Sequence, residues 1–140
     1  MEKEKLINYL EAIPFWKHLE MKVKKMGQGY VELTMPFKEE FTQGKSHMHG
    51  GALASLLDNA GAIALRTYLE FGVETVATVE MKINYLLPVT SDQREIVACG
   101  RVIKAGRTLG VSTIEIKNDK ENIVAVGIGT YVVVPQSDSK

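Results

Sequence analysis

Hydrophobic and polar positions change their spacing several times along the chain, and each spacing predicts a different element. In the first run, residues 3–13, apolar side chains recur at helical spacing, and Pro14 ends that helix or begins another short turn. Two short strands are expected next, at 21–25 and 30–36, with a glycine turn between them. The segment 37–48 has no apolar period and is expected to be a loop.

A longer run of good helix formers, residues 52–69, is apolar on most sides, which is typical of a buried helix. The sequence His49-Gly50-Gly51 opens it. One stripe of this helix carries bulkier side chains: Leu53, Leu56, Leu57, Ala60, Ile63 and Ala64. The opposite stripe carries small residues, Gly51, Ala54, Ser55, Gly61 and Ala62, with Asp58 in its middle. Such a stripe lets another backbone or a ligand approach the helix closely.

After residue 72 the pattern predicts only strands, at 76–87, 95–104, 107–117 and 123–134. Alternation in the first of them puts Ala77, Val79, Met81, Ile83 and Tyr85 on one face and Thr78, Glu80, Lys82 and Asn84 on the other. The last strand is apolar on both faces, so we expect it to be central or to lie in an interface. The polar tail, 135–140, is expected to be frayed.

Short turns between these strands require antiparallel pairing. The simplest way to bury the long helix is to wrap one curved antiparallel sheet around it. We therefore predict an α+β fold that forms a single domain over residues 1–140.

Composition narrows the classes of partner. Apolar residues make up 45% of the chain, and 17 basic residues balance 17 acidic ones, which favours a soluble protein without a nucleic-acid or membrane partner. An anionic ligand would have to be held by a local cluster of cations. No signal or membrane segment is recognisable, so we expect a cytoplasmic protein. The single cysteine, Cys99, allows no internal disulfide and is expected to be a core residue.

Asp58 is the first candidate for chemistry, because it is an acidic residue in the third turn of an otherwise apolar helix. An ionised group in such surroundings needs partners, and burial would raise the pKa of its carboxyl above the reference value near 4. The alternative is an exposed or locally capping aspartate. His49-Gly50-Gly51 is the second candidate, because backbone N–H groups at a helix start can stabilise an oxyanion. Alone, these three residues could equally be a tight turn.

The spacing of the two candidates has a geometric consequence. Eight residues of helix separate Gly50 from Asp58, which is about 12 Å. The two groups of one chain therefore cannot act on the same carbonyl. If both take part, they come from different subunits whose helices lie side by side and antiparallel, which predicts a two-fold dimer.

The segments QGKSHMHGGALASLLDN, 43–59, and VEMKINYLLPV, 79–89, resemble in this order the hotdog-fold acyl-CoA thioesterases of the phenylacetate-degradation type, in the 4-hydroxybenzoyl-CoA thioesterase superfamily. The resemblance covers roughly residues 28–134. It implies a hotdog fold, homodimers that pair into homotetramers, and hydrolysis of acyl-CoA without a metal or other cofactor.

Carried over residue by residue, Asp58 matches the catalytic carboxylate, as general base or nucleophile. Gly50 matches the N–H that polarises the thioester carbonyl, and Gln43 the side chain that orients water or the carbonyl. Thr78 matches a hydroxyl that hydrogen-bonds near the reacting group. His49 belongs to the motif and is counted among the catalytic residues, the alternative being that it only shapes the turn.

The resemblance also implies contacts to the rest of the substrate. Gly51 and Asn59 belong to the same motif, and Tyr85 and Pro88 end the strand near which the pantetheine arm would pass. The turn that would meet the nucleotide phosphates contains Lys104, Gly106, Arg107 and Thr108. Without the resemblance, that turn is more simply an ordinary hairpin with solvated cations.

Two other functions remain open at this point. His49 and Asp58 could form the acid–base pair of a hotdog hydratase acting on enoyl thioesters. Alternatively, the domain could bind acyl-CoA without turning it over, as a sensor. A pure sensor would not need Asp58.

Overall fold

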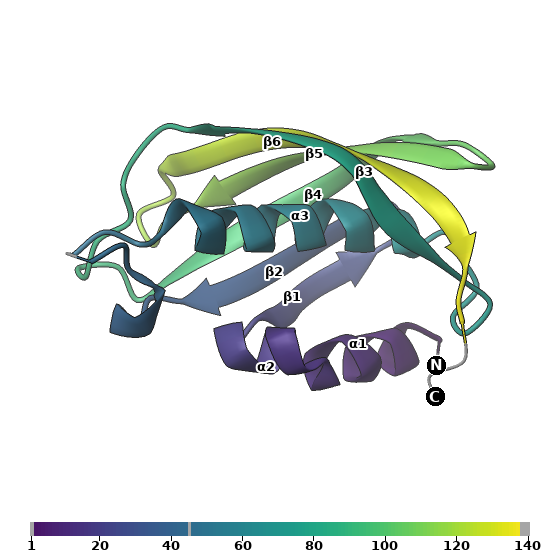
Figure 1. Ribbon diagram of the computed structural model, residues 1–140, viewed down its shortest axis with the longest axis horizontal. Coiled ribbons are helices and arrows are strands. Elements are labelled where there is room, and N and C mark those ends of the chain that lie inside the picture. Colours follow the sequence, from purple (N-terminus) through teal and green to yellow (C-terminus); the bar gives the residue numbers. More distant parts are fainter. Residues whose placement is uncertain (1, 45, 138–140) are drawn as a thin grey trace.

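The computed structural model describes residues 2–44 and 46–137. Its elements are α1 (Glu2–Ala12), α2 (Pro14–Leu19), β1 (Lys22–Gly27), β2 (Tyr30–Pro36), a 3-10 turn η1 (Glu39–Phe41), α3 (Gly50–Arg66), β3 (Glu74–Tyr85), β4 (Glu95–Ala105), β5 (Leu109–Lys117) and β6 (Ile123–Pro135). Figure 1 shows α3 within the curve of the sheet, with β6, β5 and β3 above it in this view and β1, α1 and α2 below it. This is the α+β hotdog fold that the sequence predicted.

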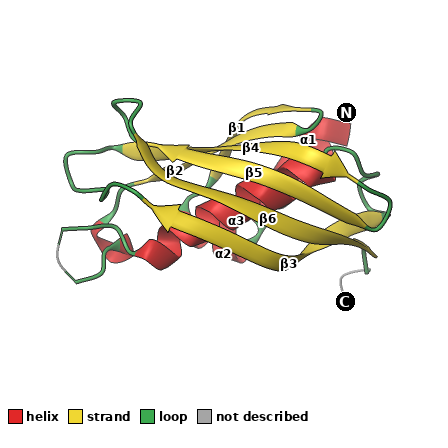
Figure 2. Cartoon of the chain, turned by 90° about the horizontal axis from the view of Figure 1, so that it is seen from above, coloured by secondary structure: helices red, strands yellow, loops and turns green. Residues whose placement is uncertain are grey.

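The six strands form one antiparallel sheet in the order β1-β2-β4-β5-β6-β3. β6 lies between β5 and β3, in agreement with its apolar character on both faces. The two edges of the sheet are therefore β1 and β3, and α3 lies across one face of it (Figure 2).

The bulkier stripe of α3 packs against the sheet and forms the centre of the core. All six of its members are buried: Leu53, Leu56, Leu57, Ala60, Ile63 and Ala64. The helix lies so close to β4 that a Cβ added at Gly100 would come within 2.4 Å of the Ala60 carbonyl oxygen. Each buried leucine or isoleucine here contributes about 1.5–3 kcal/mol by leaving water. This packing fixes the rotation of α3 and therefore which of its residues face outward.

The small-residue stripe is narrower than the sequence predicted. Ala54, Ser55, Asp58 and Ala62 are partly exposed, but Gly61 is buried against the sheet. The prediction for Gly61 failed because it was placed by size alone, whereas this glycine makes room for a side chain from β6.

β3 departs from the predicted alternation because it contains a bulge. Thr78 pairs with Tyr131 and Glu80 with Thr130, which leaves Val79 as the extra residue. The bulge reverses the alternation, so Thr78 shares the α3-facing side with Met81 and Ile83 rather than with the polar residues 80, 82 and 84. Val79 points into solvent and is 58% exposed.

Other boundaries differ by a few residues. α1 begins and ends one residue before the predicted helix, α3 begins at Gly50 and ends at Arg66, and η1 lies within the predicted loop. The tail is ordered further than expected, because Pro135 belongs to β6 and the Gln136 N–H donates to the Val73 carbonyl. The rest of the predicted frayed tail, 138–140, lies outside the described residues.

No helix in the described ranges is both long and apolar enough to span a membrane.

Candidate active site

Asp58 is held by a hydrogen bond from the neighbouring strand. The Thr78 hydroxyl donates to Asp58 Oδ1 over 2.9 Å, across the gap between β3 and α3. Asp58 itself is partly exposed within one chain, so the burial expected from its apolar neighbours is incomplete here. A partly exposed carboxylate with one oxygen fixed by a hydrogen bond can accept a proton from a reactant.

The start of α3 presents one unused backbone donor. His49 is the N-cap, and its Nδ1 accepts the Gly51 N–H over 2.7 Å. Ala52 and Leu53 donate to the His49 carbonyl. Within the described ranges the Gly50 N–H donates to no group, so it is available to a ligand at the positive end of the helix dipole.

Tyr85 and Pro88, two of the predicted substrate contacts, lie around this end of α3. The Tyr85 ring packs on Gly50, and its hydroxyl donates to the Gly50 carbonyl over 2.8 Å. Pro88 lies in the loop where the Met48 N–H donates to the Val89 carbonyl.

Gln43 lies in the loop leading to α3, beside the bridge between Thr42 and Met48, and its side chain is exposed. Its backbone N–H donates to the His47 carbonyl over 2.9 Å. The structure therefore brings Gln43 to the same end of the molecule as Gly50.

The predicted phosphate-binding turn lies at the opposite end of α3. A Cβ added at Gly110, just after the turn, would collide with the Leu65 side chain in the last turn of the helix. Lys104, Arg107 and Thr108 are exposed, and no ion pair within the described ranges involves either cation. The Gly106 N–H donates to the Leu109 carbonyl within the turn, so charge there would come from the two side chains.

Two of the predicted substrate contacts are already engaged within the chain. The Asn59 Oδ1 accepts the Trp16 indole N–H over 3.0 Å, and its amide donates to the Ser55 carbonyl. Asn59 thus ties α2 to α3, and the Gly51 N–H is taken by His49. We do not include either residue among the groups that meet the substrate.

Gly50 and Asp58 lie on one unbroken helix, as the sequence predicted. Their separation of eight residues is about 12 Å. One chain therefore offers a backbone N–H donor at one place and a carboxylate at another, with no single carbonyl position that touches both.

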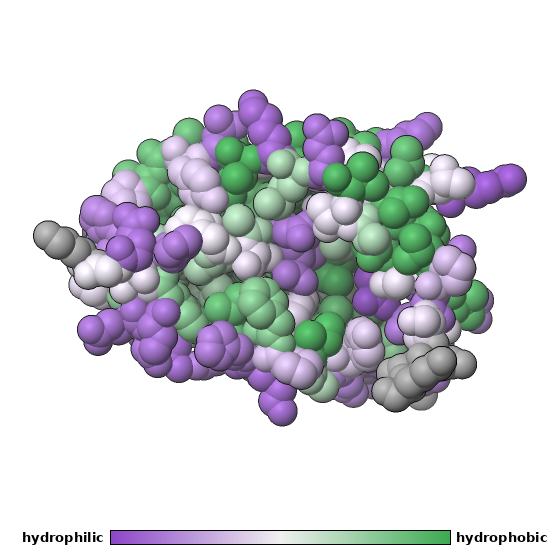
Figure 3. All heavy atoms as spheres, in the orientation of Figure 1, coloured by the Kyte–Doolittle hydropathy of each residue, from purple (hydrophilic) through white to green (hydrophobic). Residues whose placement is uncertain are grey.

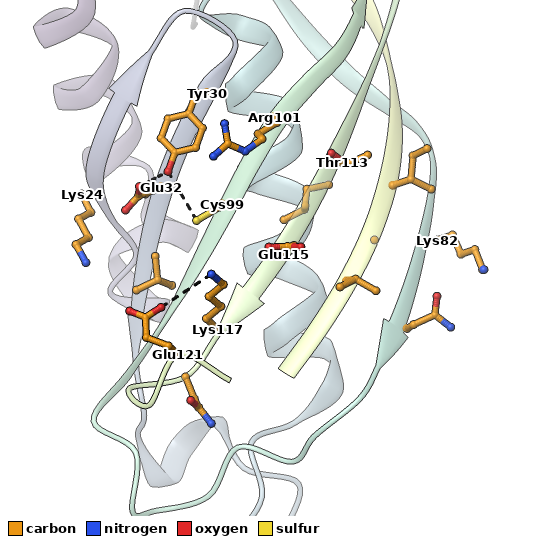
Figure 4. Close-up of a pocket in the computed structure, with 17 residues that line it drawn as sticks. Lys24, Tyr30, Glu32, Lys82, Cys99, Arg101, Thr113, Glu115, Lys117 and Glu121 are labelled. Atoms are coloured by element: carbon orange, nitrogen blue, oxygen red, sulfur yellow. Dashed lines mark hydrogen bonds and ion pairs between the residues drawn. The ribbon is translucent and has the colours of Figure 1, made fainter. Parts of the chain in front are cut away.

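A large hollow lies elsewhere, on the sheet face turned away from α3 (Figure 4). It measures about 670 Å³, and none of the predicted site residues lines it. The Tyr30 hydroxyl donates there to Glu32 and contacts Cys99 Sγ, and Arg101 stacks over the Tyr30 ring. Burial and the Glu32 and Cys99 neighbours raise the pKa of Tyr30. Cys99 is thus a half-buried residue of this groove and not the core residue that we expected.

Sequence reasoning missed Tyr131, which is fully buried and donates from its hydroxyl to the Asp58 backbone carbonyl over 3.2 Å. Burial, and then the nearby charge of Asp58, raises the pKa of this phenol. The available signal was the spacing Gly127-x-Gly129-x-Tyr131, which puts two glycines and a large ring on one face of a strand.

Comparison with known proteins decides the family. The model of the thioesterase superfamily matches residues 45–125, which is more than half of the chain and includes α3, β3 and β4. The chain belongs to the thioesterase superfamily. The resemblance read from the sequence is thereby confirmed at the level of the family and its hotdog fold.

Several known proteins resemble this chain over much of its length. Thioesterase HI1161 of Haemophilus influenzae is 27% identical, with a TM-score of 0.85 over 96% of this chain and 92% of its own. The Escherichia coli PaaI protein of the phenylacetic acid degradation operon is 26% identical, with a TM-score of 0.85 over 95% and 93%. Human acyl-coenzyme A thioesterase 13 is 34% identical over 90 residues, 64% of this chain and 62% of its own.

Proposed function

We propose that this protein is an acyl-CoA thioesterase that works as a two-fold dimer, with Asp58 as its catalytic carboxylate. The observation that carries the proposal is the Asp58 carboxylate, oriented by Thr78 on the partly exposed face of α3, eight residues from the unused Gly50 N–H. Family membership and the acyl-coenzyme A activity in the human relative's name support the substrate class.

The reaction needs a group that activates water and a group that stabilises the oxyanion. Asp58 takes a proton from water as the water oxygen attacks the thioester carbonyl carbon, and the Gly50 N–H of the other protomer donates to the carbonyl oxygen. The C–S bond then breaks, the thiolate of CoA takes up the proton, and the free acid leaves. Direct attack by Asp58 would give the same products through an anhydride that water hydrolyses.

The dimer places the two groups together only if its α3 helices run antiparallel. β3 supports such a dimer because it is an open edge strand of 12 residues on which Val79 is exposed. Figure 3 shows apolar surface among polar side chains over this part of the molecule. The family resemblance adds pairing of dimers into a tetramer, which light scattering of the purified protein tests directly.

The anionic end of CoA is assigned to the turn between β4 and β5. Lys104 and Arg107 supply two cations without partners among the described residues, and Thr108 adds a hydroxyl. Tyr85 and Pro88 are assigned to the pantetheine arm, near the carbonyl end. The hydratase alternative is disfavoured, because His49 Nδ1 is already committed to the cap of α3.

The test is thiol release from a panel of aliphatic and aromatic acyl-CoAs, with wild type and Asp58→Asn in parallel. We expect CoA release by wild type and a loss of at least about 100-fold in the variant, because its acid–base group is gone. Binding of acyl-CoA without release of thiol would overturn the proposal in favour of a sensor. Addition of water to an enoyl-CoA would overturn it in favour of a hydratase.

Isotope labelling tests whether Asp58 acts as a nucleophile or as a general base. In a single turnover in ¹⁸O-labelled water, a nucleophilic carboxylate forms the anhydride and takes up label when water attacks its Asp58 carbonyl carbon, whereas a general base takes up none. Label found by mass spectrometry in the peptide containing Asp58 therefore identifies a nucleophile.

A further inference from the structure

Tyr131 on β6 contacts Asp58, as does Thr78 on the neighbouring strand β3. The two side chains lie directly opposite each other in the β3–β6 register. The Thr78 hydroxyl donates to the Asp58 carboxylate and the Tyr131 hydroxyl donates to the Asp58 backbone carbonyl. One residue of α3 is therefore fixed at both its side chain and its backbone by neighbouring positions of the sheet.

The slot for the Tyr131 hydroxyl exists because two side chains are missing. A Cβ added at Gly61 or at Gly129 would lie 2.2 Å from the Tyr131 hydroxyl oxygen. Gly61 belongs to α3, one turn after Asp58, and Gly129 to β6, two residues before Tyr131. Larger residues at either position would force the ring to move. The glycines on α3 and on β6 therefore both leave the space that the Tyr131 hydroxyl needs to reach the Asp58 carbonyl.

The phenol is suited to a permanent structural hydrogen bond. It is fully buried, and burial together with the Asp58 charge raises its pKa, so it stays a donor throughout the neutral range. Such a bond holds the backbone that carries a reactive group, and small misplacements of a reactive group lower a rate strongly.

We propose that Tyr131 is a positioning residue for the hydrolytic reaction, fixing the α3 backbone at Asp58 so that its carboxylate meets the thioester in a productive geometry. This inference rests on the proposed thioesterase function. Tyr131 touches no substrate in the proposed arrangement and acts only through Asp58.

The molecule offers a matched control. Ser112 on β5 is also fully buried and also donates its hydroxyl to an α3 carbonyl, that of Gly61, over 2.9 Å. Tyr131→Phe and Ser112→Ala each remove one buried hydroxyl that binds the α3 backbone. Only the first removes it from Asp58, so a general loosening of α3 affects both variants alike.

The test combines steady-state kinetics with a double-mutant cycle. We expect Tyr131→Phe to lower kcat about 10-fold with KM changed less than about 2-fold, because orientation and not substrate binding is lost. Ser112→Ala should melt at a comparably reduced temperature with kcat within about 2-fold of wild type. In the Asp58→Asn background, Tyr131→Phe should cost less than about 2-fold, because the group it positions is gone.

The outcomes separate this inference from the function on which it rests. Wild type that releases no thiol overturns the function itself. Active wild type with an Asp58-dependent rate overturns only the role of Tyr131 if Tyr131→Phe matches Ser112→Ala, or if its loss persists undiminished in the Asp58→Asn background. Should Tyr131→Phe fail to fold, Gly129→Ala displaces the hydroxyl while keeping it, and full kcat in that variant overturns the role.

Discussion

The two edges of the sheet have opposite characters, although both are exposed strands of the same structure. β1 has six residues and β3 has 12. Lys22, Lys24 and Lys25 are exposed along β1, and the Glu11 carboxylate of α1 accepts the Val23 N–H over 2.8 Å. β3 carries exposed Val79 and Ala77 instead, and no described segment pairs with its outer side.

Lysines, short length and a covering helix are the features by which proteins keep an edge strand from pairing. β1 has all three, whereas β3 is long, carries a single lysine, Lys82, and has no described segment over its outer edge. The contrast indicates that only the β3 edge is left open for another chain. It also places the open edge beside Thr78 and Asp58. In the proposed dimer, assembly and catalysis therefore meet on this flank of α3, and we expect the other flank to be structural.

Giving β3 the character of β1 should have the largest effect. Val79→Lys places an exposed charge on the open β3 edge of each molecule, which opposes pairing of two such edges. We expect light scattering to report monomers and thiol release to fall at least about 100-fold, because Asp58 then lacks its partner's Gly50. Ile128→Lys is the control, since Ile128 is 41% exposed on β6 but lies away from the edge. A monomeric Val79→Lys protein with full activity would disprove the shared site.

The hydrogen bond between β3 and α3 is the next most sensitive feature. Thr78→Val keeps the branched shape and removes the donor to Asp58 Oδ1. We expect kcat to fall about 10-fold, which corresponds to about 1.4 kcal/mol for a hydrogen bond to a charged group. Thr75→Val on the same strand is the matched control, because no side-chain hydrogen bond of Thr75 is present among the described residues. Equal kcat values for the two variants would leave Thr78 without a role.

The fold was predictable because its periodicities are strong and the elements follow in an order that permits few arrangements. The long helix and its bulkier stripe, the four late strands and their antiparallel order all follow from patterns of burial. The sequence also predicted the candidates Asp58 and Gly50 and the distance between them, because the rise of a helix converts residue spacing into distance.

The errors came where tertiary contacts override local pattern. A single extra residue, Val79, reverses the faces of β3, and alternation alone cannot reveal a bulge. Gly61 was assigned to the open side of α3 by its size, whereas the Tyr131 ring occupies the space beside it. Tyr131 lies 70 residues further along the chain, and no local signal joins such a pair. The hydrogen bond between Trp16 and Asn59, which are 43 residues apart, has no local signal either.

The structural flank of α3 should affect stability without affecting turnover. Trp16→Phe removes the indole N–H that donates to Asn59 and leaves a part-buried amide oxygen without that donor. We expect the free energy of unfolding to fall by about 1–3 kcal/mol, measured by urea denaturation, with kcat within about 2-fold of wild type. A large loss of kcat in a well-folded Trp16→Phe protein would mean that Asn59 does belong to the site.

Making β1 resemble β3 should have the smallest effect on activity and gives the converse test of the comparison. Lys24→Val combined with Lys25→Val removes two exposed charges from the short edge, so neighbouring molecules are no longer repelled there. Because Glu11 still covers the Val23 N–H, we expect only weak, concentration-dependent association beyond the wild-type oligomer in sedimentation velocity, and thiol release within about 2-fold of wild type. Strong assembly that also alters activity would show that β1 is a second functional edge, and the distinction between the two flanks of α3 would then fail.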